Sequence, residues 1–173
     1  MAGDTQNLSR RQFLRGDYRG RNAVVRPPWA IPQPRFLSLC NRCGKCRDAC
    51  AQRIIELTDS GYPQINFLNG ECTFCGDCAR ACSEGALAYS TRVASWQIKA
   101  IVMPECITRR GVVCRSCGEQ CGTGAIRFRF TKGGVGQPRM NAAACTGCGA
   151  CCAVCPAQAI ALRNAAVYQE ACA

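Results

Sequence analysis

The chain has 173 residues, of which 18 are cysteine and none is histidine, and its 22 Lys and Arg stand against 11 Asp and Glu. Such a cysteine content is typical of chains in which disulfides or metals replace part of the apolar core. The lack of histidine excludes mixed His and Cys zinc sites, Rieske-type ligation, histidine general bases and Ser-His-Asp triads, because each needs an imidazole nitrogen. Thiolates must therefore carry the chemistry.

The first 35 residues form an arginine-rich arm that holds seven arginines against two aspartates. The arginines are Arg10, Arg11, Arg15, Arg19, Arg21, Arg26 and Arg35. This excess of positive charge favours contact with an acidic or polar partner, and a solvated leader without a partner is the alternative.

Ser9 to Arg15 is similar to the twin-arginine motif that directs folded proteins out of the bacterial cytoplasm. An export segment needs an apolar stretch of about 7–15 residues next. Charged residues interrupt any such stretch here, and four prolines then follow between Pro27 and Pro34. Because these prolines prevent a helix, we expect no cleavable export segment and a cytoplasmic location.

One cysteine spacing recurs through the rest of the chain. Cys-x2-Cys-x2-Cys-x3-Cys occurs three times, and a fourth run lengthens the first gap to seven residues. The regular runs are Cys40, Cys43, Cys46, Cys50; Cys72, Cys75, Cys78, Cys82; and Cys145, Cys148, Cys151, Cys155, while the irregular run is Cys106, Cys114, Cys117, Cys121. Identical spacing at this period indicates a repeated structural unit.

The spacing suits a cubane iron–sulfur cluster, because a short loop with thiols three residues apart can wrap three of its four irons. In two-cluster ferredoxins the last cysteine of each run ligates the other cluster. The same crossing would bring Cys82 to the first run, Cys50 to the second, Cys155 to the irregular run and Cys121 to the last. The expected cofactors are therefore 4Fe-4S clusters, at the three regular motifs and at the irregular motif as a fourth.

Two other uses of the cysteines are open. Disulfides fit an even count but belong to oxidising compartments. Zinc can be held by four cysteines from two Cys-x2-Cys pairs, although four cysteines within eleven residues, three times over, is not the usual layout. Cys152 and Cys172 lie outside the runs; the first is expected to be a buried small residue, and the second a tail residue or a transient thiol for transfer of iron or sulfur.

Charge and hydropathy exclude two further classes of partner. Four clusters with their thiolates would remove about 8 positive charges, and no recognition motif accompanies the basic residues, so nucleic-acid binding is not expected. The uncharged run 140–162 is long enough to span a bilayer, but it contains five cysteines and Pro156. Ligand thiols and irregular backbone are not tolerated in lipid, so we expect no transmembrane segment.

Short extended runs precede the second and last motifs. Residues 54–57 and 64–67 predict one hairpin, and residues 125–130 and 138–141 predict another. Ala79–Cys82 and Cys152–Cys155 are each long enough for one helical turn. We therefore expect an α+β fold of tandem bacterial ferredoxin-like units, each built for two 4Fe-4S clusters, with small antiparallel hairpins and short helices.

The expected organisation is an arm at 1–35, a first ferredoxin unit at 36–92 and a second at 93–173, joined near Ser90 to Lys99. The second unit contains the irregular motif at 106–121 and the regular motif at 145–155. Cores this small fold poorly alone, so cluster binding should be coupled to folding.

Several segments beyond the cysteine runs carry a family resemblance. They are Arg26-Pro27-Pro28-Trp29, Gly61-Tyr62-Pro63 with Asn66-Phe67, Glu71-Cys72-Thr73-Phe74-Cys75, the irregular third motif and the twin-arginine-like start. Together they resemble the NapF family, the ferredoxin-type proteins of periplasmic nitrate reductase systems, from about residue 8 to residue 162. The long loop after Cys106 departs from the standard cysteine spacing, and the proline that usually follows the last cysteine of a run is present only at Pro156.

The resemblance implies a cytoplasmic accessory protein that contacts the catalytic, molybdenum-containing subunit before export, with the arm as the candidate contact, and helps to install its iron–sulfur cluster. A polyferredoxin that relays single electrons to an oxidoreductase is the alternative, because low-potential cubanes serve both roles. The sequence shows no nucleophile, acid–base pair or nucleotide loop, so we do not expect an enzyme.

Overall fold

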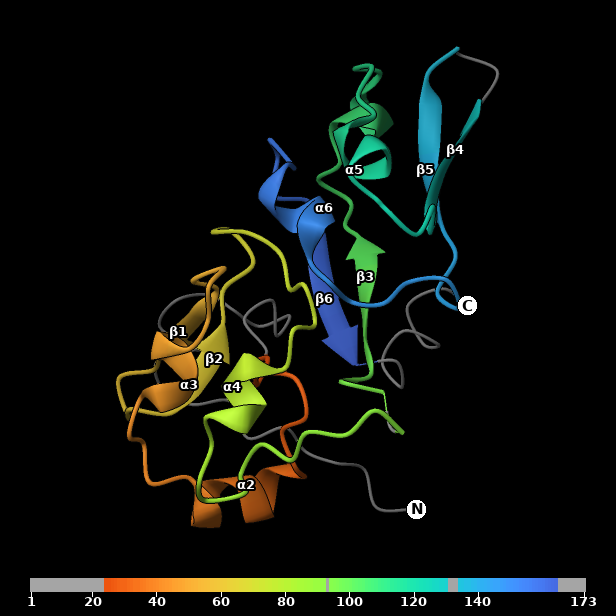
Figure 1. Ribbon diagram of the computed structural model, residues 1–173. Helices are drawn as coiled ribbons and strands as arrows, with labels where there is room; N and C mark the ends of the chain where they lie inside the picture. Colours follow the sequence, from red (N-terminus) through yellow and green to blue (C-terminus); the bar gives the residue numbers. More distant parts are fainter. Residues whose placement is uncertain (1–23, 93, 131–133, 165–173) are drawn as a thin grey trace, which may run out of the picture.

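The computed structural model describes residues 24–92, 94–130 and 134–164 (Figure 1). Its elements are short and alternate between helices and strands. In chain order they are α2 (Gln33–Leu39), α3 (Lys45–Asp48), β1 (Ile55–Leu57), β2 (Pro63–Ile65), α4 (Asp77–Arg80), β3 (Ile98–Val102), the 3₁₀ helix η1 (Ile107–Arg110), α5 (Ser116–Glu119), β4 (Ile126–Phe130), β5 (Gly136–Met140), α6 (Ala150–Ala153) and β6 (Ile160–Asn164). These elements are consistent with the small α+β, ferredoxin-like architecture expected from the sequence.

Two of the antiparallel sheets are the hairpins that the sequence predicts. In β1–β2, Ile55 pairs with Ile65, and in β4–β5, Ile126 pairs with Met140. The third sheet, β3–β6, was not predicted, since Ile98–Val102 begins inside the stretch expected to join the units. Its three β-branched residues, Ile98, Ile101 and Val102, favour a strand, but its partner lies about 60 residues further along the chain.

A single helical turn follows the second cysteine of each run. The helices α3, α4 and α6 begin after Gly44, Gly76 and Gly149, whose φ angles are 77°, 83° and 84°. This left-handed backbone favours glycine. The irregular run has Arg115 in the same place, with an extended φ of −135°. The helices α4 and α6 begin two residues before the turns predicted from the sequence.

Residues 24–35, although expected within the arm, pack against the first pair of cysteine runs. Pro27, Pro28 and Phe36 are among the most deeply buried side chains. The Arg26 guanidinium lies 5.1 Å from the centre of the Phe36 ring, donates to the Pro63 carbonyl at 2.9 Å, and has a pKa lowered mainly by burial. The rest of the arm, including the twin-arginine-like motif, lies outside the described residues.

The expectation that the prolines prevent a helix is wrong for Gln33–Leu39. Pro32 precedes α2 as its N-cap, and Pro34 lies within the first turn. A proline is tolerated there because the first amides of a helix have no partner inside it.

The buried core is small and includes cysteines. Phe36, Ile54 and Leu87 fill its N-terminal half, and Ala100 and Ile126 belong to its C-terminal half. In Figure 1 the β3–β6 sheet lies between the helices α2 to α4 and the β4–β5 hairpin. Across the described ranges, every helix is too short or too polar to cross a membrane.

Candidate iron–sulfur centres

Two cavities among the first two cysteine runs are each lined by four cysteines. Site 1 is a cavity of about 20 Å³ lined by Cys40, Cys43, Cys46 and Cys82. Site 2 is a cavity of about 20 Å³ lined by Cys72, Cys75, Cys78 and Cys50. Each site thus collects the first three cysteines of one run and the last cysteine of the other, as in the crossed pattern of two-cluster ferredoxins.

The last two runs show the same exchange of the last cysteine at one site. Site 3 is a cavity of about 20 Å³ lined by Cys106, Cys114, Cys117 and Cys155. The remaining cysteines of these runs, Cys145, Cys148, Cys151 and Cys121, are the set expected at site 4. There the pKa of Cys151 is raised by its hydrogen bond with Cys152 and by burial, with a smaller contribution from the neighbouring Cys121 thiolate, which places Cys121 beside the last run.

Several of these thiols resist ionisation. Burial raises the pKa of Cys46 and Cys72 to about 11 and that of Cys78 and Cys117 to about 12, and neighbouring cysteines of the same site add repulsion. Crowded, buried thiols of this kind become thiolates when a cationic group replaces their protons. The donor chemistry of the four sites therefore fits a metal cluster.

Zinc and a cubane place different demands on four thiols. A tetrahedral zinc ion holds its sulfurs about 3.8 Å apart around one ion, whereas a cubane distributes its four ligands over four irons and so accepts a wider ring of thiols. Among the described residues, no compact group of three or more Cys, Asp or Glu side chains forms a site for a single metal ion. Every described cysteine is a free thiol, so the described ranges contain no disulfide.

The long loop of the irregular motif is folded so that Cys106 still reaches its site. The loop forms η1, and the Thr108 side chain, which is only 2% exposed, lies 3.2 Å from the Cys106 sulfur. The Gln137 side-chain amide donates to the Thr108 carbonyl at 2.7 Å. Sequence analysis missed Thr108 and Gln137, because nothing in the spacing shows that β5 supports this loop.

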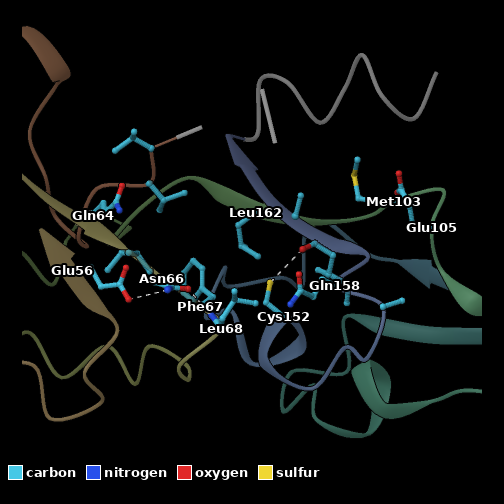
Figure 2. A pocket seen from close by; sticks show the side chains of 16 residues that line it. Glu56, Gln64, Asn66, Phe67, Leu68, Met103, Glu105, Cys152, Gln158 and Leu162 are labelled. Atoms are coloured by element: carbon cyan, nitrogen blue, oxygen red, sulfur yellow. Dashed lines mark hydrogen bonds between the residues drawn. The ribbon is translucent and has the colours of Figure 1, made fainter. Parts of the chain in front are cut away.

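A wider cavity lies between the β1–β2 hairpin and β6 (Figure 2). Its volume is about 720 Å³, and Cys152 is the one cysteine among its lining residues. The Cys152 thiol is buried and lies 3.7 Å from the Ile160 carbonyl oxygen. This cavity therefore lacks the four thiols of a cluster site, and the position of Cys152 fits a small buried residue. Cys172 lies outside the described residues.

Comparison with known proteins agrees with this geometry. The family model described as "4Fe-4S dicluster domain" matches residues 39–86 and 110–159. The ferredoxin-type protein NapF of Escherichia coli K12 is 41% identical over 154 residues, which cover 89% of this chain and 93% of the relative. The chain belongs to the NapF family of ferredoxin-type proteins. The NapF protein of Haemophilus influenzae is 40% identical over 169 residues, covering 92% of this chain and 96% of the relative.

A second group of relatives shares the architecture at lower identity. The methylamine utilization ferredoxin-type protein MauM of Methylophilus methylotrophus is 32% identical over 146 residues, which cover 75% of this chain and 65% of that protein. Family membership makes this chain a ferredoxin-type iron–sulfur protein with tandem 4Fe-4S dicluster domains. The second matched region begins after Cys106, which is the cysteine set apart by the long loop.

The crossed arrangement can be tested by removing the last cysteine of the first or second run. Cys82→Ala is expected to empty site 1 and lower the iron content from about 16 to about 12 atoms per chain. Alkylation followed by peptide mass spectrometry should then label the other cysteines of site 1, while those of the second run stay protected. Cys50→Ala should produce the reverse labelling.

Cys152→Ala is the matched control for this experiment, because Cys152 is a buried cysteine outside the four sites. It should keep the full iron content. If Cys82→Ala instead exposed the first three cysteines of its own run, the ligands would not be crossed.

Proposed function

We propose that this protein assists loading of the 4Fe-4S cluster into the catalytic subunit of periplasmic nitrate reductase in the cytoplasm, before that subunit is exported. It would hold four clusters of its own at sites 1 to 4, in the ferredoxin units 36–92 and 93–173. The observation that carries this proposal is the grouping of cysteines into three crossed sets, each around a small cavity. The same mixture of three cysteines from one run and one from another supports the same kind of occupant at each of these sites.

The residues around the sites suit a low-dielectric redox centre. Cys78 and Cys151 are buried, which limits the access of water to sites 2 and 4. The Phe74 amide donates to the Cys72 sulfur at 3.4 Å, and the Ala159 amide donates to the Cys155 sulfur at 3.2 Å. Such donors stabilise negative charge on the sulfurs and so favour the reduced state. Clusters at these sites would supply single electrons to a client whose own cluster is being assembled.

The arm would supply the contact with the client. Its five arginines before residue 24 form a basic segment, which suits an acidic surface. The segment that follows is fixed to the fold: the Trp29 indole donates to the Ser90 carbonyl at 2.8 Å, and the Val25 carbonyl accepts from the Ile65 amide at 2.8 Å. A client held by the arm would therefore be kept beside the first two sites.

Electron transfer to an oxidoreductase is a second candidate function. It is favoured by a direct backbone contact between cysteines of the two halves, in which the Cys72 amide donates to the Cys148 carbonyl at 2.8 Å. A carrier that served separate partners at each unit would not need this contact.

The two functions predict different states of the client. In cells that lack this protein, the catalytic subunit should contain less iron and labile sulfide than the same subunit from complete cells. Expression of the wild-type chain or of Cys152→Ala should restore the iron content, and a chain with a ligand cysteine replaced should not. If the catalytic subunit from cells that lack this protein were fully loaded with iron but inactive, the loading role would be excluded and electron transfer favoured.

A further inference from the structure

The two halves of the chain meet at cysteine loops that belong to different sites. The Cys72 amide of site 2 donates to the Cys148 carbonyl of site 4 at 2.8 Å. Sites 2 and 4 are therefore direct neighbours, although their motifs are separated by the whole irregular run.

Aromatic side chains pack on both sides of this junction. The Trp96 ring lies 5.8 Å from Phe67 and 5.9 Å from Phe74, both in edge-to-face geometry. The same indole donates to the carbonyl of Thr146, inside the loop of the last motif, at 3.2 Å. The approach is so close that a Cβ atom added at Gly149 would overlap the Phe67 ring. The junction is thus a packed interface rather than a loose linker.

Within each half the sites are neighbours through the exchanged cysteines. Cys50 ends the run whose first three cysteines line site 1, yet it lines site 2, and Cys155 ends the run expected at site 4, yet it lines site 3. Site 3, beside α5 and the β4–β5 hairpin, lies at the opposite end of the molecule from α2 and α3 in Figure 1. Site 3 therefore has no neighbour in the first half.

We propose that the sites form one linear electron path in the spatial order 1, 2, 4, 3, which differs from their order in the sequence. This inference rests on the proposed function, because it takes all four sites as cluster sites. A one-electron donor at either end would reduce the terminal site, each transfer would oxidise one site and reduce the next by one electron, and a one-electron acceptor would be reduced at the other end. No bond is made or broken in these steps.

At each end of this path, an exposed apolar side chain directly precedes a ligand cysteine. Leu39 precedes Cys40 of site 1 and is 36% exposed, and Val113 precedes Cys114 of site 3 and is 72% exposed. Exposed apolar residues next to a redox site suit transient contact with a protein partner. Sites 1 and 3 are thus accessible as terminal sites.

The order can be tested by removing one site in the second half and recording the EPR spectrum of the dithionite-reduced holoprotein. Neighbouring paramagnetic clusters broaden each other's signals, whereas an isolated cluster gives a sharp signal. Cys145→Ala removes site 4 and should leave site 3 isolated, so a sharp component should appear beside the coupled spectrum. Cys117→Ala removes site 3 and should give no sharp component, since sites 1, 2 and 4 remain adjacent.

A sharp component in Cys117→Ala but not in Cys145→Ala would place site 3 at the junction. A sharp component in both variants, or in neither, would also overturn the proposed order. Iron analysis separates this result from a failure of the proposed function. The wild-type chain should contain about 16 iron atoms and each variant about 12. A wild-type content of about 12 would mean that one site holds no cluster, in which case the four-cluster proposal itself fails.

A second pair of variants tests the junction without removing a ligand. Gly149→Ala should disturb the contact with Phe67 and weaken the coupling between sites 2 and 4, with all iron retained. Gly44→Ala is the matched control, because Gly44 has a similar φ of 77° at the same place in the first motif and an added Cβ would lie 3.7 Å from its nearest neighbour, the Arg47 guanidinium. Equal spectra for the two variants would show that this contact does not bring the two sites together.

Discussion

Removal of iron and sulfide is expected to unfold this protein rather than to leave a folded apoprotein. The hairpin β1–β2 has three residues in each strand, and the helices α3 to α6 have four residues each. Isolated hairpins and helices of this length are not stable in water. Much of the remaining core consists of alanines and the ligand cysteines Cys78 and Cys151.

The expected loss of stability follows from comparing two free energies. Structural metal sites in small domains contribute on the order of 10 kcal/mol to folding, while a whole domain is stable by about 5–15 kcal/mol. Loss of the clusters should therefore abolish the cooperative thermal transition. Anaerobic treatment with an iron chelator, followed by far-UV circular dichroism and Trp fluorescence, would measure it.

Cys152→Ala serves as the control, because it removes a buried thiol that is not a ligand in this interpretation. Its cluster-loaded form should unfold in one transition close to that of the wild-type chain, with a loss of about 1 kcal/mol for a small cavity. An iron-free protein that kept the wild-type transition would show that the apolar core alone determines the fold.

The sequence predicted the parts of this fold that depend on short-range patterns. The hairpins around residues 61 and 134 follow from apolar runs separated by glycine turns, and the cysteine spacing indicated which thiols could share a site. The β3–β6 sheet could not be predicted in the same way, since its strands Ile98–Val102 and Ile160–Asn164 are far apart in sequence and no turn joins them.

The junction between the halves was also beyond the sequence. It depends on Trp96 reaching the carbonyl of Thr146 and on the close approach of Gly149 to Phe67, and neither pairing has a local signal. The supporting role of Gln137 for the irregular motif is a long-range contact of the same kind. Spacing predicted which cysteines could be grouped, whereas the proposed order of the groups depends on these tertiary contacts.

Replacement of the arm arginines is expected to weaken binding of the client without affecting the clusters of this protein. The residues to change to Gln are Arg10, Arg11, Arg15, Arg19 and Arg21. Exposed ion pairs contribute about 0.2–1 kcal/mol each, so loss of five of them should weaken the affinity by at least about fivefold at low salt. Arg26 is left unchanged, because its contacts with Phe36 and Pro63 support the fold.

The measurement is binding of the purified catalytic subunit at two salt concentrations, together with iron analysis of the variant itself. The difference between variant and wild type should shrink as salt increases, since screening weakens exposed charges first. Arg127→Gln with Arg129→Gln is the control, because both arginines are exposed on β4, in the second half of the chain. If the control weakened binding as much per arginine removed as the arm variant, the client would respond to the total charge of the protein, and a specific role for the arm would be excluded.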